Sequence, residues 1–98
     1  MKVRFLLPAQ YELDEAIEYY NSEVPELGNA FLLETLAVIE RICQYPEGWH
    51  PLSPNTRRCR LRRFPYGVVY AMLDGEIVIL AVAHLHRKPD YWRERLSQ

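Results

Sequence analysis

The stretch RRCRLRRFPYGVVYAMLDGEIVILAVAHLHRKPDYW, residues 57–92, decides the fold. It predicts three consecutive strands, with a tight hairpin between the second and the third. Asp74 and Gly75 make a two-residue loop that suits a type I′ turn, in which both residues need a positive φ. The runs on either side, residues 66–73 and 77–83, are almost continuously apolar and rich in β-branched residues. Such runs are typical of central strands buried on both faces of a sheet.

The first half of the chain predicts a short strand and two helices. Residues 2–6 alternate as a strand, and Pro8 then suits the first turn of a helix, where its missing N–H costs nothing. This amphipathic helix ends near Glu23, before Pro25. A second helix, residues 26–45, has an apolar face wide enough to pack on both the sheet and the first helix, leaving little to expose. We therefore expect a two-layer α+β fold, in which an N-terminal strand and a helical hairpin pack on one face of a mainly antiparallel sheet, in the order β-α-α-β-β-β.

Three arginines alternate with apolar residues in the first of the three late strands. Period-two geometry puts Arg58, Arg60 and Arg62 on one face of the sheet and the apolar residues between them on the other. Because unpaired arginines are not buried in proteins, we expect the face opposite the helices to be solvated. Residues 47–55, just before this strand, contain two prolines and predict a loop.

Length and composition are those of one ordinary globular domain, residues 1–98. Hydrophobic residues make up 49% of the chain and charged residues 26%, and no apolar run approaches the roughly 18 residues of a membrane span. Acids after Pro8 interrupt the N-terminal apolar patch well short of a signal peptide, so we expect a cytoplasmic protein without membrane contact. Two cysteines, Cys43 and Cys59, do not make a disulfide framework.

The net charge of −1 hides an opposition between the two halves of the chain. Residues 1–50 have three basic residues and nine acids, a net charge of −6, whereas residues 51–98 have nine basic residues and four acids, a net charge of +5. This asymmetry suggests a polyanion or an acidic protein as the partner of the second half, and a solvated two-tone surface is the alternative.

Five segments, in this order, carry a family resemblance. They are YELDEAIEYY in the first helix, LGNAFLLETLAVIERICQYPE in the second, then RRFPYGVVYAML, EIVILAVAH and HRKPDYW. Together they are similar to toxins of the RelE/ParE superfamily from type II toxin–antitoxin systems, over nearly the whole chain. The resemblance implies a compact toxin without a cofactor, held by a cognate antitoxin in a hetero-oligomer. Its target would be DNA gyrase or the translating ribosome with its mRNA.

The resemblance also separates a nuclease from a non-nucleolytic toxin. Nucleases of this superfamily cleave mRNA by 2′-hydroxyl attack on the adjacent phosphate, which needs cations and a positioned acid or base. Where those nucleases have an arginine after the first aromatic residue of a strand, this chain has Gly67, which cannot hold a phosphate. Arg87 resembles their second arginine and Tyr91 their C-terminal tyrosine, although the spacing is shorter. If this chain is a nuclease, its candidates are therefore Arg63, Arg87 and Tyr91, with His86 as acid or base.

Other candidate residues serve binding. Those expected to contact the antitoxin or the target are Arg58, Arg60, Arg62, Arg63, Arg87 and Trp92. Tyr91 and Trp92 also fit lids over the core, and His86 and Arg87 also fit hydrogen bonds that cap the sheet edge. A metal site built on His84 and His86, with His50 as third ligand, lacks acid or cysteine support, so we expect no metal.

We interpret the chain as a ParE-like toxin that inhibits growth through DNA gyrase and is neutralised by its antitoxin. Gly67 favours this function over the first alternative, a ribosome-dependent mRNA interferase. The second alternative is a non-toxic binding module on the same fold.

Overall fold

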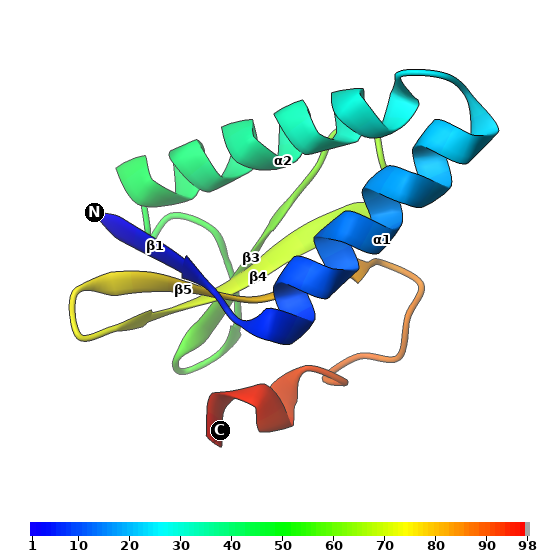
Figure 1. Cartoon of the computed structure of the whole chain (residues 1–98). Helices are drawn as coiled ribbons and strands as arrows, with labels where there is room; N and C mark the ends of the chain where they lie inside the picture. The colour runs from blue at the N-terminus through cyan, green and yellow to red at the C-terminus, as the bar shows by residue number, and fades with distance from the viewer. Residues whose placement is uncertain (98) are drawn as a thin grey trace.

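A five-stranded sheet with two helices on one face makes up the computed structural model, which describes residues 1–97 (Figure 1). The strands lie in the order β1-β5-β4-β3-β2, with β1 parallel to β5 and the other neighbours antiparallel. The elements are β1 (Lys2–Phe5), α1 (Leu7–Glu23), α2 (Leu27–Gln44), β2 (His50–Ser53), β3 (Thr56–Arg60), β4 (Tyr66–Leu73), β5 (Glu76–His84) and the 3-10 helix η1 (Arg93–Ser97). The predicted α+β class and its helical layer are confirmed.

The hairpin of β4 and β5 forms the centre of the sheet. Asp74 has φ 50° and Gly75 φ 76°, so both residues of the loop have the positive φ that a type I′ turn needs. Residues 68–71 of β4 and 77–83 of β5 are buried, and each strand has a neighbour on both sides. The predicted turn and the predicted central position of both strands are confirmed.

The two helices form an antiparallel hairpin that packs on this sheet. Helix α1 ends at Glu23 because Val24, which precedes Pro25, has an extended backbone. Beneath the helices Phe31 contacts two aromatic residues from the strand side, with ring centroids 5.1 Å from Phe64 and 4.9 Å from Tyr66. Neither helix within residues 1–97 is long and apolar enough to cross a membrane.

Helix α2 exposes more apolar surface than its sequence predicts. Leu33 is 69% exposed and Leu36 49% exposed. The buried residues of α2 form one stripe, which includes Phe31, Val38 and Ile42, and both leucines lie outside that stripe. The expectation that α2 would leave little apolar surface exposed is therefore wrong.

Strand β2 lies within the segment that we expected to be a loop. Residues 50–53 pair with β3 in antiparallel fashion at the edge of the sheet. Pro51 favoured the loop. An edge strand nevertheless tolerates proline, because the missing N–H breaks no hydrogen bond on the side of the strand that faces solvent. The order of strands and helices therefore has one strand more than the sequence predicts.

The sheet face opposite the helices is largely apolar, which contradicts the predicted solvated arginine face. Its buried residues are Val69, Ala71, Val78, Leu80, Ala81 and Ala83. The C-terminal segment folds back over them, as the red end of the ribbon in Figure 1 shows, and Trp92 is only 5% exposed there. This cover comes from a segment distant in sequence, so a local pattern does not predict it. The arginines of β3 lie at the rim of the covered face.

Candidate functional site

Strand β3 presents two of the three predicted arginines on the face opposite the helices. In the sheet register Arg58 lies opposite Val69, which belongs to the apolar cluster of that face, and Arg60 lies opposite Gly67. The predicted alternation is therefore confirmed for Arg58 and Arg60. It is wrong for Arg62, because β3 ends at Arg60.

Gly67 leaves room for the side chain of Arg58. A Cβ atom at position 67 would lie 2.9 Å from both Cγ and Cδ of Arg58, closer than carbon atoms pack. The buried Nε of Arg58 has no hydrogen-bond partner within residues 1–97. Burial, and next the charge of Arg60, lower the pKa of Arg58 below its usual value. Gly67, which stands where the nucleases have an arginine, thus lies against Arg58 on the neighbouring strand β3. Arg58 is half-buried and has no ion pair within residues 1–97.

Arg62 and Arg63 lie in the short loop after β3. Their backbone N–H groups both donate to the carboxylate of Glu34 on α2, at 3.2 Å for Arg63. Both side chains are exposed, and the Arg63 guanidinium lies 5.6 Å from the ring centroid of Phe64. Glu34 thus holds the backbone of the loop and leaves both guanidinium groups at the surface.

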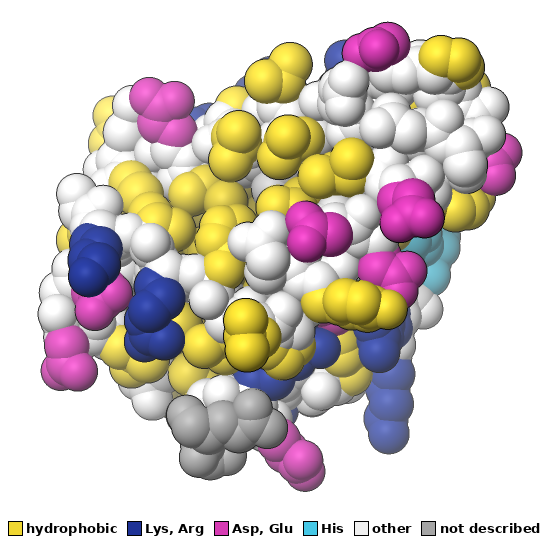
Figure 2. All heavy atoms as spheres, viewed as in Figure 1, with side chains coloured by type: hydrophobic (Ala, Val, Ile, Leu, Met, Phe, Trp, Pro, Cys, Tyr) yellow, Lys and Arg dark blue, Asp and Glu magenta, His cyan; other side chains and the backbone are white. Residues whose placement is uncertain are grey.

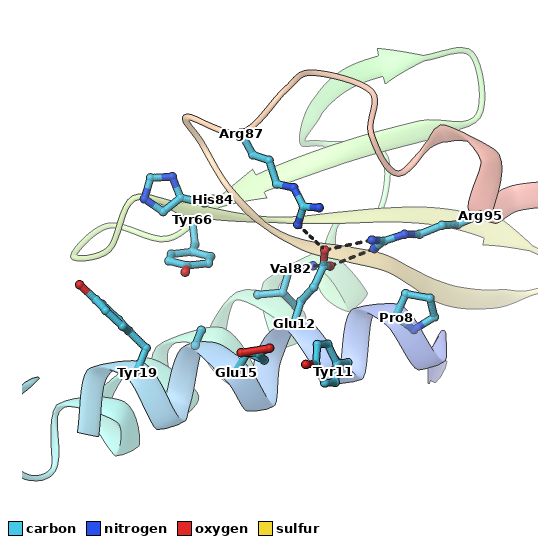
Figure 3. A pocket seen from close by; sticks show the side chains of 11 residues that line it. Pro8, Tyr11, Glu12, Glu15, Tyr19, Tyr66, Val82, His84, Arg87 and Arg95 are labelled. Atoms are coloured by element: carbon cyan, nitrogen blue, oxygen red, sulfur yellow. Dashed lines mark hydrogen bonds and ion pairs between the residues drawn. The ribbon is translucent and has the colours of Figure 1, made fainter. Parts of the chain in front are cut away.

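A second group of arginines surrounds the carboxylate of Glu12, whose side chain is 12% exposed (Figure 3). Arg95 donates to both oxygens, at 2.9 Å from Nη1 and 3.0 Å from Nη2. The Tyr91 hydroxyl donates at 2.7 Å and the Val82 backbone N–H at 3.0 Å, while Arg87 approaches at 3.4 Å. Such charge-assisted bonds are the strongest hydrogen bonds in proteins. Glu12 therefore fastens the C-terminal segment to both α1 and β5.

The predicted catalytic residues Arg87 and Tyr91 belong to this Glu12 cluster. The Arg87 guanidinium stacks 3.9 Å from the Tyr91 ring centroid. Burial, and then the hydrogen bond to Glu12, raise the pKa of the Tyr91 phenol, which therefore stays protonated at neutral pH. While the protonated hydroxyl donates this hydrogen bond to Glu12, Tyr91 is not available as a base.

Two residues of the cluster, Glu12 and Arg95, are not among the site residues predicted from the sequence. Glu12 follows Ala9 by three residues and precedes Ala16 by four, and both alanines are buried. This position on the helical wheel was a signal that it borders the core. Arg95 offered no such signal, because its partner lies 83 residues away in the chain.

The three histidines do not come together. The His86 backbone N–H donates to Nδ1 of His84 at 3.1 Å, and the two rings lie 5.1 Å apart. His50 belongs to β2, with β3 and β4 between it and β5. Because neighbouring strands are about 4.8 Å apart, the backbones of β2 and β5 are about 14 Å apart. The described part of the chain contains no group of three potential ligands for a metal ion.

An open cavity of about 400 Å³ lies between α1 and the second half of β5 (Figure 3). Its lining residues are Pro8, Tyr11, Glu12, Glu15, Ala16, Tyr19, Tyr66, Val82, His84, Arg87 and Arg95. A smaller cavity of about 100 Å³ lies near the far face, where Arg58, Arg87 and Trp92 are among the lining residues. Arg87 is the one predicted site residue that borders both cavities.

Known proteins resemble the chain in sequence. The family model described as the ParE toxin of the type II toxin–antitoxin system, parDE, matches residues 3–90. Two relatives called Toxin ParE2, from Mycobacterium tuberculosis strains CDC 1551 / Oshkosh and ATCC 25618 / H37Rv, are each 38% identical over 87 residues. The match covers 88% of this chain and 83% of each relative.

Two solved structures share the fold. A chain of the chromosomal ParDE TA system from P. aeruginosa superposes with a TM-score of 0.76 at 20% identity, covering 88% of this chain and 97% of that chain. The isolated E. coli RelE toxin gives a TM-score of 0.54 at 19% identity, covering 98% and 95%. At these identities the likeness concerns the fold alone.

Proposed function

The chain belongs to the ParE family of toxins from type II toxin–antitoxin systems, and from this premise we propose that it inhibits growth by acting on DNA gyrase, without cleaving RNA. In the resting cell a cognate antitoxin holds it in a cytoplasmic hetero-oligomer. The observation that carries the proposal is the pairing of Gly67 with Arg58. It removes a phosphate-binding arginine from the position where the nucleases have one.

The state of the other catalytic candidates supports the same function. RNA cleavage needs a group that exchanges protons and cations that face the phosphate. The Tyr91 hydroxyl donates its hydrogen bond to Glu12, and the same carboxylate lies 3.4 Å from Arg87. Among the predicted catalytic residues that can exchange a proton, His86 is the one left; its side chain is exposed, and its backbone N–H donates to His84.

Neutralisation by an antitoxin is supported by the unpaired arginines. Within residues 1–97, no carboxylate forms an ion pair with Arg58, Arg60, Arg62 or Arg63. Guanidinium groups bind carboxylates in a bidentate manner, so an acidic segment of the antitoxin suits them as a partner. The antitoxin and the target then compete for one surface, which explains neutralisation simply.

The same arginines give the interferase alternative its support, because unpaired cations also suit an RNA phosphate. In that case Arg58 or Arg60 supplies the charge that is missing at Gly67. A non-toxic binding module is distinguished from both toxins by forced expression that leaves growth unchanged.

A reconstituted assay tests the proposal. The purified chain should inhibit supercoiling by DNA gyrase and leave mRNA on programmed ribosomes intact. RNA cleavage that His86→Ala abolishes, together with unimpaired gyrase, would overturn the proposed function.

A further inference from the structure

We propose that the cavity between α1 and β5 is a pocket for a basic side chain of the antitoxin. It is separate from the surface that Arg58 and Arg60 of β3 provide. This inference rests on the proposed function in one respect, that the chain has an antitoxin partner. It adds a second contact of opposite charge to the one that the arginines of β3 provide.

The α1 wall of the cavity is an acid between two aromatic rings. Tyr11, Glu15 and Tyr19 follow one another at spacings of four residues, so they form one stripe along the helix. Figure 3 shows Glu15 between the two rings, and all three side chains are exposed. Helix α1 contains no lysine or arginine, and Figure 2 shows acidic side chains gathered over it. This wall therefore attracts a cation.

The sheet side of the cavity adds a third aromatic ring and apolar lining residues. Tyr66 faces the cavity across from Tyr19, and the His84 ring packs edge-on at 5.1 Å from it. Ala16 and Val82, both buried, add apolar surface to the lining. Aromatic rings around a carboxylate are the surroundings that bind an ammonium or guanidinium group.

The charges already in the cavity leave Glu15 available. Arg95 and Arg87 both point at Glu12, as the dashed lines in Figure 3 show, and Arg95 is bound to both of its oxygens. Glu15 has no ion pair within residues 1–97, and its bond to the Tyr11 hydroxyl raises the pKa of that phenol. A cation that enters beside Glu15 meets an acid that no cation of the described chain has neutralised.

The geometry of the sheet edge favours a side chain over an added strand. Strand β1 pairs with β5 only as far as Ile79, so the rest of β5 has an edge without a neighbouring strand. Along that edge Glu12 accepts from the Val82 N–H and Arg95 donates to the Leu80 carbonyl. An incoming strand would have to break both bonds. A single side chain that enters the cavity breaks neither.

Titration calorimetry with the purified cognate antitoxin tests the inference. Glu15→Gln should weaken binding about tenfold, the loss of one charge-assisted hydrogen bond. Glu18→Gln, which removes the same charge from the same helix outside the cavity, should change binding less than about twofold. Each basic residue of the antitoxin should then be neutralised in turn. For one of these antitoxin variants, Glu15→Gln in the toxin should weaken binding no further.

Two results would overturn the inference. One is an equal loss for Glu15→Gln and Glu18→Gln, because only the overall charge of α1 would then matter. The other is that Glu15→Gln abolishes self-association of the chain but leaves antitoxin binding intact, which assigns the cavity to a second copy. The calorimetry uses purified proteins and does not depend on the target of the toxin. If the chain binds its antitoxin through Glu15 but does not inhibit gyrase, only the proposed target is refuted.

Discussion

The arginines of β3 and those of the C-terminal segment differ in what they contact. Arg58 and Arg60 meet no carboxylate within residues 1–97, and Gly67 makes room for the first of them. Arg87 and Arg95 share the carboxylate of Glu12, whose remaining donors are a phenol and a backbone N–H. We infer that the paired arginines hold the fold together and that the unpaired ones are available to a partner.

The largest effect on stability should come from the centre of the paired group. Glu12→Ala leaves Arg95, 15% exposed, without its counter-ion and should lower the free energy of unfolding by about 3 kcal/mol. Urea unfolding measures this loss. Glu18→Ala removes an exposed acid from the same helix and should cost less than about 0.5 kcal/mol. Equal losses in the two variants would show that the Glu12 cluster adds no more than a surface charge.

The next largest effect on stability should come from alkaline pH, which ionises buried phenols. Burial raises the pKa of Tyr70 to about 12, and the pKa of Tyr91 is raised by burial and by Glu12. A phenol whose pKa is higher in the folded than in the unfolded chain favours folding below pH 10, and this stability is lost as pH rises through the folded pKa. Tyr70 alone should cost about 1.4 kcal/mol at pH 11 relative to pH 9.

Denaturation at the two pH values measures this alkaline loss in three variants. Tyr70→Phe and Tyr91→Phe should each reduce it, because each removes one of the buried phenols. Tyr45→Phe, at an exposed tyrosine, should leave it unchanged. An undiminished loss in Tyr70→Phe would contradict the account.

A smaller effect should follow from filling the space at Gly67. Gly67→Ala places a methyl group 2.9 Å from two carbons of Arg58 and should cost about 1 kcal/mol. The cost should vanish in an Arg58→Ala background, and a double-mutant cycle of urea unfolding measures this coupling. Additive effects of the two substitutions would mean that Gly67 is not there for the sake of Arg58.

The smallest effect on stability should accompany a large effect on binding. Arg60→Glu with Arg62→Glu should change the free energy of unfolding by less than about 0.5 kcal/mol, because both guanidinium groups are solvated. The same variant should lose antitoxin binding or toxicity. Unfolding of the Arg60 and Arg62 variant would show that these side chains support the fold.

The parts of the fold that depend on local patterns could be predicted from the sequence. The Asp74-Gly75 turn, the two buried strands beside it and the end of α1 before Pro25 each follow from neighbouring residues. Strand β2 could not be recognised, because four residues with a proline resemble a loop and form a strand only through pairing with β3.

The candidate site depended more on distant contacts, and the sequence predicted less of it. Alternation along β3 placed Arg58 and Arg60 correctly, but the cover over the far face comes from Trp92 and Leu96, which no local pattern connects to it. The role of Glu12 rests on partners 70 to 83 residues away. Such contacts appear only once the whole chain is folded.

Controlled induction of the chain in bacteria, with thymidine and methionine incorporation followed together, tests most directly whether this toxin acts on DNA gyrase. Thymidine incorporation should stop first. A chain with Glu12→Ala that still folds should retain this order, because the Glu12 cluster serves the structure. Methionine incorporation that stops first would contradict this target, since translation would then be inhibited and Arg63, Arg87 or a neighbouring arginine would have to supply the charge that Gly67 lacks.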